Sequence, residues 1–180
     1  MNPDRDAQSK ELPNRRSIRL KGYDYSRNGF YFITITTNKM RHLFGEIKNA
    51  KLISFPHEPD KMIEKLLLKI EEKFENTKIE PYIIMPNHIH FILQIENFPA
   101  FDKTKLGEMI GWFKTMTTNE YINCVKSGLF KPFYKRLWLR NYYEHIIRDV
   151  DEHSRIWDYI ENNPQKWEEK SRKKKHAFSS

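Results

Sequence analysis

The sequence holds a single cysteine, Cys124, among its 180 residues, so an intrachain disulfide is excluded. The disulfide-stapled scaffolds typical of oxidising compartments are excluded with it. No stretch approaches the roughly 18 uninterrupted apolar residues of a membrane-spanning helix, and residues 1–5 lack the apolar core of a secretion signal. We therefore expect a cytoplasmic protein with no membrane association.

Internal repeats and low-complexity linkers are also missing, which argues against a repeat architecture or several domains. With 38% hydrophobic and 31% charged residues, the chain has enough apolar material for one core. Residues 1–14 are polar and without periodicity, so we interpret them as a flexible leader. The expected organisation is this leader, a single domain over residues 15–167 and a basic tail over residues 168–180.

Acidic residues are in deficit: 24 Asp and Glu stand against 32 Lys and Arg, which gives a net charge of +8. Three segments carry the excess, each with +4: residues 15–27 (five basic, one acidic), 131–148 (five, one) and 166–175 (six, two). Such clustering favours a polyanionic partner. The last segment has a simpler reading as a solvated tail.

Aromatic and basic side chains alternate in the middle segment between Phe133 and Tyr143, a pattern that suits phosphate contacts combined with base stacking. A strand with its aromatic side chains inward and its cations outward would produce the same pattern. Both readings leave the cations on the surface. The candidate nucleic-acid-binding residues of this segment are Lys135, Arg136 and Arg140.

Hydrophobic periodicity predicts the secondary structure. Strand-like runs occupy residues 30–37, 79–85, 89–95 and 142–148, with a short hairpin over 43–55. Helical spacing predicts helices at residues 60–76 and 106–124, and a third that begins at a capping box of Asp149 and Glu152 and ends at Pro164. This order predicts an α+β, ferredoxin-like fold, in which an antiparallel sheet carries helices on one face and a further C-terminal helix follows.

Two histidines stand two residues apart at the start of a predicted strand, in the sequence Met85-Pro86-Asn87-His88-Ile89-His90. Residues i and i+2 of a strand share a face, so His88 and His90 point the same way. Neutral imidazole is a common metal ligand, although a strand pair of this kind is more often structural. Two ligands do not complete a metal site, so a third must come from elsewhere.

The third predicted helix offers one candidate. Tyr159 and Asn163 are four residues apart and share a helical face, next to the apolar stripe of Ile156 and Ile160. A phenol and a carboxamide would then face the sheet together. The simpler reading is a partly buried tyrosine and an asparagine that caps the helix end.

The order of these motifs resembles the HUH tyrosine transposases. The first motif is His88-Ile89-His90, directly after Met85-Pro86-Asn87. The second is Tyr143-Glu144-His145, and the third is Tyr159-Ile160 followed by Asn163-Pro164. The chain is most similar to the branch of REP-associated tyrosine transposases, single-domain enzymes of the insertion-sequence type, over roughly residues 15–167.

The resemblance implies a single-stranded DNA nuclease and strand transferase with a 5′-phosphotyrosine intermediate. It implies that Tyr159 is the nucleophile, and that His88, His90 and Asn163 hold Mg²⁺ or Mn²⁺. It also implies that the basic segment before the first strand contacts single-stranded or hairpin DNA, through Arg15, Arg16, Arg19 and Lys21. We expect a monomer, with a dimer as the alternative, and association with the nucleoid.

Several points depart from this reading. Many relatives have Trp-Gln before the Tyr-Glu-His stretch, whereas Leu139 follows Trp138 here.

Tyr142 and Tyr143 are rival nucleophiles, although neither has a candidate ligand one helical turn away. A module that binds single-stranded DNA or RNA without cleaving it would also keep the fold and the charge.

Overall fold

The computed structural model describes residues 23–96 and 104–177. Its strands are β1 (Gly29–Thr36), β2 (Gly45–Lys48), β3 (Lys51–Ser54), β4 (Thr77–Met85), β5 (His88–Ile95) and β6 (Tyr143–Ile147). Its helices are α1 (Pro59–Lys73), α2 (Leu106–Lys126), α3 (Val150–Glu161) and α4 (Asn163–Ala177), with a short 3-10 turn at Asn38–Met40. The expected strands and helices all form, with ends that differ by a few residues.

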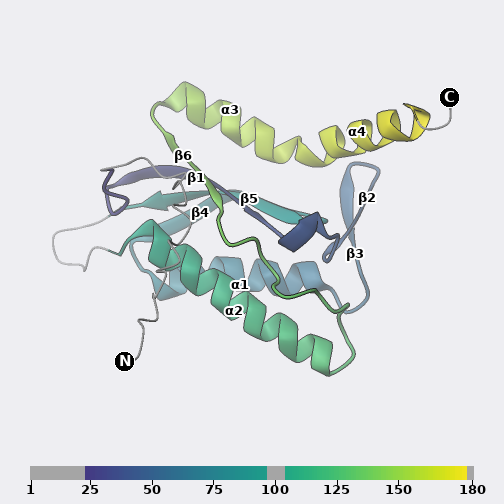
Figure 1. The fold of residues 1–180 in the computed structure, drawn as a ribbon. Helices are drawn as coiled ribbons and strands as arrows, with labels where there is room; N and C mark the ends of the chain where they lie inside the picture. The colour runs from purple at the N-terminus through teal and green to yellow at the C-terminus, as the bar shows by residue number, and fades with distance from the viewer. Residues whose placement is uncertain (1–22, 97–103, 178–180) are drawn as a thin grey trace, which may run out of the picture.

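The main sheet has the strand order β4-β5-β1-β6, and every neighbouring pair is antiparallel. With the β2–β3 hairpin set aside as an insertion, this is the ferredoxin-like order. In Figure 1, α1 and α2 cover one face of the sheet, while α3 and α4 run along the other. The predicted fold is therefore confirmed, and the C-terminal helices occupy the face that α1 and α2 leave open.

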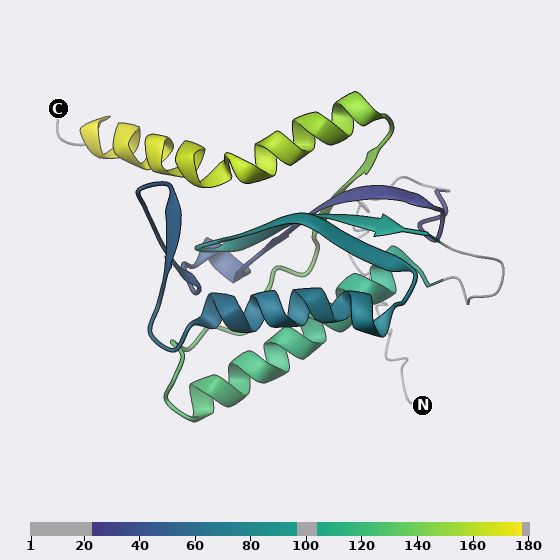
Figure 2. The ribbon, with the colours of Figure 1, turned by 180° about the vertical axis from the view of Figure 1, so that it is seen from behind.

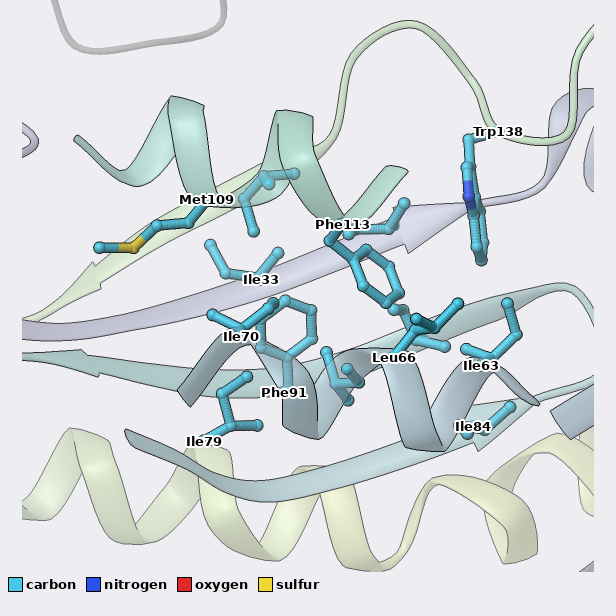
Figure 3. Packing of buried hydrophobic residues seen from close by; sticks show 14 of the residues in the cluster. Ile33, Ile63, Leu66, Ile70, Ile79, Ile84, Phe91, Met109, Phe113 and Trp138 are labelled. Atoms are coloured by element: carbon cyan, nitrogen blue, oxygen red, sulfur yellow. The ribbon is translucent and has the colours of Figure 1, made fainter. Parts of the chain in front are cut away.

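The larger core lies between the sheet and the pair α1 and α2. Strand alternation sends Ile33 and Phe91 to this face, where they meet Leu67 of α1 and Phe113 of α2. All four side chains are fully buried. Figure 3 shows the side chains of the sheet and both helices pointing toward one another in this layer. Burial of this apolar surface is the main contribution to the free energy that holds the sheet against the two helices.

A smaller core lies on the opposite face, where Phe32, Ile92 and Ile147 of the sheet pack against Ile160 of α3. The capping box at the start of α3 forms as predicted, since the Asp149 carboxylate accepts a hydrogen bond of 2.7 Å from the backbone N–H of Glu152. The cap sets where α3 begins, and Ile160 sets which side of α3 faces the sheet.

The C-terminal end of the chain corrects the expected end of the third helix. Helix α3 ends at Glu161, three residues before Pro164, and Pro164 lies in the first turn of a new helix, α4. Proline is tolerated there because backbone N–H groups in the first turn of a helix have no acceptor within the helix, so the N–H that proline lacks is not needed. The expected boundary of a separate tail at residue 168 falls inside α4, which Figure 2 shows beside the raised β2–β3 hairpin.

The leader and the basic residues Arg15, Arg16, Arg19 and Lys21 lie outside the described residues. Between residues 23 and 96 and between 104 and 177, no helix has the length and apolar character needed to cross a membrane.

Candidate active site

The histidine pair opens β5 at the centre of the sheet. In the register of β5 with β1, His88 lies opposite Thr36 and His90 opposite Thr34. Ile89 between them is buried in the larger core, so both histidines face α3 and α4, as the strand alternation predicted. Their ring centroids are 4.5 Å apart. The pair therefore forms one compact cluster of imidazoles under the C-terminal helices.

Each histidine is oriented through its Nδ1 atom. His90 Nδ1 is 2.8 Å from the hydroxyl of Thr34, and His88 Nδ1 is 2.7 Å from Oδ1 of Asn87. The Asn87 amide nitrogen donates to the carbonyl of Met40 at 3.0 Å, so its oxygen is the atom left to accept from His88. With Nδ1 engaged in both rings, the Nε2 atoms are the ones available to a metal ion, the usual arrangement of ligating histidines.

Burial also sets the charge of the pair. It lowers the pKa of His90 to about 3 and that of His88 to about 4, with smaller contributions from His88 and His42 respectively. His90 is only 5% exposed. Both rings are therefore neutral at physiological pH, and neutral imidazole is the form that binds metal ions.

Tyr159 lies directly against this cluster. Its ring centroid is 5.4 Å from that of His90 and 5.9 Å from that of Phe32. The side chain is 39% exposed, so a substrate can reach it. The ammonium group of Lys166 lies 5.4 Å from the centre of the phenol ring. The structure therefore brings together the phenol and the imidazoles that the sequence placed on separate elements, and adds a positive charge beside them.

Asn163 is the first residue of α4 and is 7% exposed. Tyr159, Asn163 and Trp167 follow one another at intervals of four residues. Tyr159 contacts the ring of His90, and the ring of Trp167 lies 5.6 Å from that of His88. Asn163 is therefore held between two residues that both contact the histidine pair, although it starts a helix and does not end one.

The donor set fits a divalent ion. Across the described part of the chain, no group of three or more His, Cys, Asp and Glu side chains could hold a metal. An ion bound here would rest on the two imidazole nitrogens, and Asn163 is the candidate for a third protein ligand. Imidazole ligands suit Mn²⁺ better than Mg²⁺, which prefers a shell of oxygen atoms.

The predicted cations of the middle segment are exposed and lie at the same end of the sheet. Lys135, Arg136 and Arg140 belong to the stretch between α2 and β6. Backbone hydrogen bonds from Asn38 to Leu137 and from Leu139 to Thr36, both 2.8 Å, join this stretch to the end of β1. Thr36 is the residue paired with His88, so this stretch passes the end of the sheet where the histidine pair begins. The three cations themselves line a groove along α2, on the face of the sheet opposite the histidines.

Four residues of the site had no role in the sequence interpretation: Thr34, Asn87, Lys166 and Trp167. Strand register decides that Thr34 lies opposite His90, and a single sequence does not reveal register. Trp167 had a signal, because it continues the four-residue spacing of Tyr159 and Asn163. The expected end of the helix at Pro164 concealed it.

The rival tyrosines are placed differently from one another. Tyr143 lies on β6 opposite Thr34, is exposed, and has its ring 6.3 Å from that of Phe32. Tyr142 packs against the larger core on the other face. Tyr143 therefore shares the face of the site, which makes it the appropriate control for tests of Tyr159.

Comparison with known proteins identifies the family. Residues 31–163 match the family model described as "Transposase IS200 like". An uncharacterized protein of Haemophilus influenzae (strain ATCC 51907 / DSM 11121 / KW20 / Rd) is 34% identical over 170 residues, which cover 88% of this chain and 92% of that protein. A second protein of that strain, provisionally named a REP-associated tyrosine transposase, is 27% identical over 79% of this chain and 74% of its own length.

The fold also resembles a solved structure, that of a REP-associated tyrosine transposase bound to a REP hairpin. The TM-score is 0.55 with 20% identity, over 82% of this chain and 73% of that one. The family match spans most of the chain and contains the histidine pair, Tyr159 and Asn163. The chain therefore belongs to the IS200-like transposase family.

Proposed function

We propose that the chain is a metal-dependent endonuclease and strand transferase for single-stranded DNA that acts through Tyr159. The observation that carries the proposal is the contact of an accessible phenol with the buried, neutral imidazole of His90, 5.4 Å between ring centres, whose ring in turn lies against that of His88. A tyrosine and a metal-binding pair in contact are the minimum apparatus for a phosphotyrosine reaction.

The reaction assigned to Tyr159 is attack of the phenol oxygen on a backbone phosphorus. A bond forms between that oxygen and the 5′-phosphate, the bond to the 3′-oxygen breaks, the phenol loses its proton and the departing oxygen gains one. The reverse reaction with another 3′-hydroxyl rejoins the strand, so transfer needs no external energy source. A divalent ion, when bound, supplies polarisation of the scissile phosphate.

The chain's own groups prepare this step. A phenol with an ordinary pKa near 10 is a weak nucleophile at neutral pH and benefits from a nearby positive charge. The Lys166 ammonium group, 5.4 Å from the Tyr159 ring, is placed to attract the phosphate of the strand. When an ion is bound, His88 and His90 would hold it through Nε2, and Asn163 would complete its protein ligands.

The proposed substrate is single-stranded or hairpin DNA. A duplex would shield the phosphate geometry that this site requires, whereas an unpaired strand can reach the exposed Tyr159 side chain. The similar solved structure holds a REP hairpin. The basic residues 135, 136 and 140, which line a groove along α2, are proposed to hold the strand outside the histidine face, and the segment with Arg15, Arg16, Arg19 and Lys21 is proposed to add more cations.

The test is formation of a protein–DNA adduct that survives denaturant. Incubation with hairpin-bearing single-stranded DNA and Mn²⁺ should give the adduct with the wild-type protein and with Tyr143→Phe, and none with Tyr159→Phe. Light scattering of the same samples tests the expected monomer against a dimer.

An adduct that persists in Tyr159→Phe would contradict the assignment of the nucleophile. If no adduct forms on any hairpin substrate while DNA still binds, the chain is a non-catalytic binding module.

A further inference from the structure

An exposed aromatic ring lies beside the turn that follows β1, at the end of the sheet where His88 begins β5. Tyr134, in the stretch between α2 and β6, is 51% exposed and packs on neither core. Two ammonium groups lie over its ring: Lys39 at 4.7 Å and Lys135 at 5.2 Å from the ring centre. The fold therefore presents to solvent a ring and two cations that contribute nothing to the hydrophobic cores.

The backbone around this ring is held in an uncommon conformation. Lys39, Met40 and Lys135 have φ values of 58°, 51° and 60°, in the left-handed region that residues other than glycine seldom adopt. The Asn38 side chain donates to the carbonyl of Tyr134 at 2.9 Å and locks the two loops together. Local strain of this kind is concentrated at binding and catalytic sites.

The ring is joined to the histidine pair by a short chain of contacts. The carbonyl of Met40 accepts the hydrogen bond of Asn87 that orients His88, and Asn87 in turn accepts at its backbone carbonyl from Thr37 at 2.8 Å. His42, two residues beyond Met40, has its ring 5.6 Å from that of Trp167. The turn that carries Lys39 is therefore connected, through Met40 and His42, to the residues that surround the histidine pair.

We propose that Tyr134, Lys39 and Lys135 form a binding site for one unpaired nucleotide of the DNA strand that Tyr159 cleaves. The base stacks on the Tyr134 ring in place of one ammonium group, and the lysines pair with the phosphates on either side. Stacking on an aromatic ring requires a base outside a duplex, so the site takes single-stranded DNA. This inference rests on the proposed function in that the same strand occupies both sites.

The experiment measures binding of a fluorescent, unstructured single-stranded DNA by anisotropy, in the Tyr159→Phe protein so that cleavage does not interfere. Tyr134→Leu should weaken binding about tenfold, whereas Tyr134→Phe, which keeps the ring, should bind within about twofold of the parent. Lys39→Gln should reduce the dependence of affinity on salt, and Lys126→Gln, an exposed lysine at the end of α2, should not.

A scan with single abasic nucleotides identifies the stacked base. One abasic position should weaken binding of the parent protein but have no further effect on Tyr134→Leu. Thermal unfolding of each variant verifies that the fold is intact, as expected for a side chain outside both cores.

Three results would overturn the inference. The first is equal affinity of Tyr134→Leu and its parent for the single strand, the second is an equal loss of affinity of Tyr134→Leu for the matching duplex, and the third is tighter Tyr134-dependent binding of the RNA strand.

These outcomes are separable from the proposed function. If wild-type protein forms the adduct and Tyr134→Leu binds DNA normally, only the nucleotide site fails. If no adduct forms but Tyr134→Leu loses DNA binding, the nucleotide site stands and the cleavage proposal fails.

Discussion

At the residue scale, the site depends on hydrogen bonds that hold each imidazole in one orientation. Thr34 is the partner of His90 from the neighbouring strand, at 2.8 Å. Its hydroxyl contacts the Nδ1 atom of His90, whereas the Nε2 atom of that ring is the one proposed to bind the ion. Groups in this position typically contribute about a factor of 10 to 100 to metal affinity, because a ring that is free to rotate binds more weakly.

Replacement of Thr34 tests this role. Thr34→Val keeps the shape of the side chain and removes the hydroxyl, so the affinity for Mn²⁺ should fall about 10- to 100-fold by titration calorimetry. Thr34→Ser keeps the hydroxyl and should bind Mn²⁺ like the wild type. Equal affinities for the valine and serine variants would show that His90 needs no such partner.

At the scale of elements, the position of α4 relative to the hairpin decides whether the Trp167 ring reaches that of His88. Next to Trp167, the Glu168 carboxylate accepts hydrogen bonds from the backbone N–H groups of Asn49 and Ala50, at 3.3 and 3.0 Å. Both bonds lower the pKa of the Glu168 carboxyl group, and the bond from Ala50 has the larger effect, so the carboxylate is charged at neutral pH. We call this contact between α4 and the hairpin the clamp.

Removal of the clamp should loosen α4. In Glu168→Ala, trypsin should cut α4 at Lys170 and Arg172 faster than in the wild type, and the DNA adduct should form more slowly. Glu169→Ala is the control, because the side chain of Glu169 accepts a hydrogen bond from Gln165 within α4. Unchanged digestion of Glu168→Ala would mean that the contact of Trp167 with the histidines holds α4 without the hairpin.

At the scale of the whole molecule, the buried histidines link the stability of the fold to pH. His90 and His88 have pKa values of about 3 and about 4 in the folded chain, whereas the unfolded values lie near 6.5. Between these limits the unfolded chain binds protons that the folded chain does not. The free energy of unfolding therefore falls as the pH decreases from about 6.5 towards 4.

Denaturant unfolding in the presence of a chelator measures this loss. The wild-type protein should lose stability between pH 6.5 and pH 4, with each buried histidine contributing on the order of 2 kcal/mol. In His90→Gln the loss should be smaller by about that amount, while other titrating groups contribute equally to both proteins. Parallel curves for the two proteins would show that His90 binds its proton equally well in the folded and the unfolded chain.

Much of this protein was predictable from local pattern. The strand and helix periodicities, the capping box at Asp149 and the shared direction of His88 and His90 all follow from spacings of two to four residues. Local geometry alone generates such spacings, so one sequence is enough to see them. The four-residue interval between Tyr159 and Asn163 was visible in the same way, although the break between α3 and α4 was not.

The sequence by itself determined which side chains share a face, because the periods of a strand and a helix are properties of the local backbone. Only the tertiary structure decided which faces meet. Register placed Thr34 beside His90, and the packing of Ile160 turned Tyr159 toward the same ring. The hairpin contact of Glu168 brought Trp167 over His88. These pairings join residues far apart in the chain, and they follow from burial of two cores at once, which no local pattern encodes.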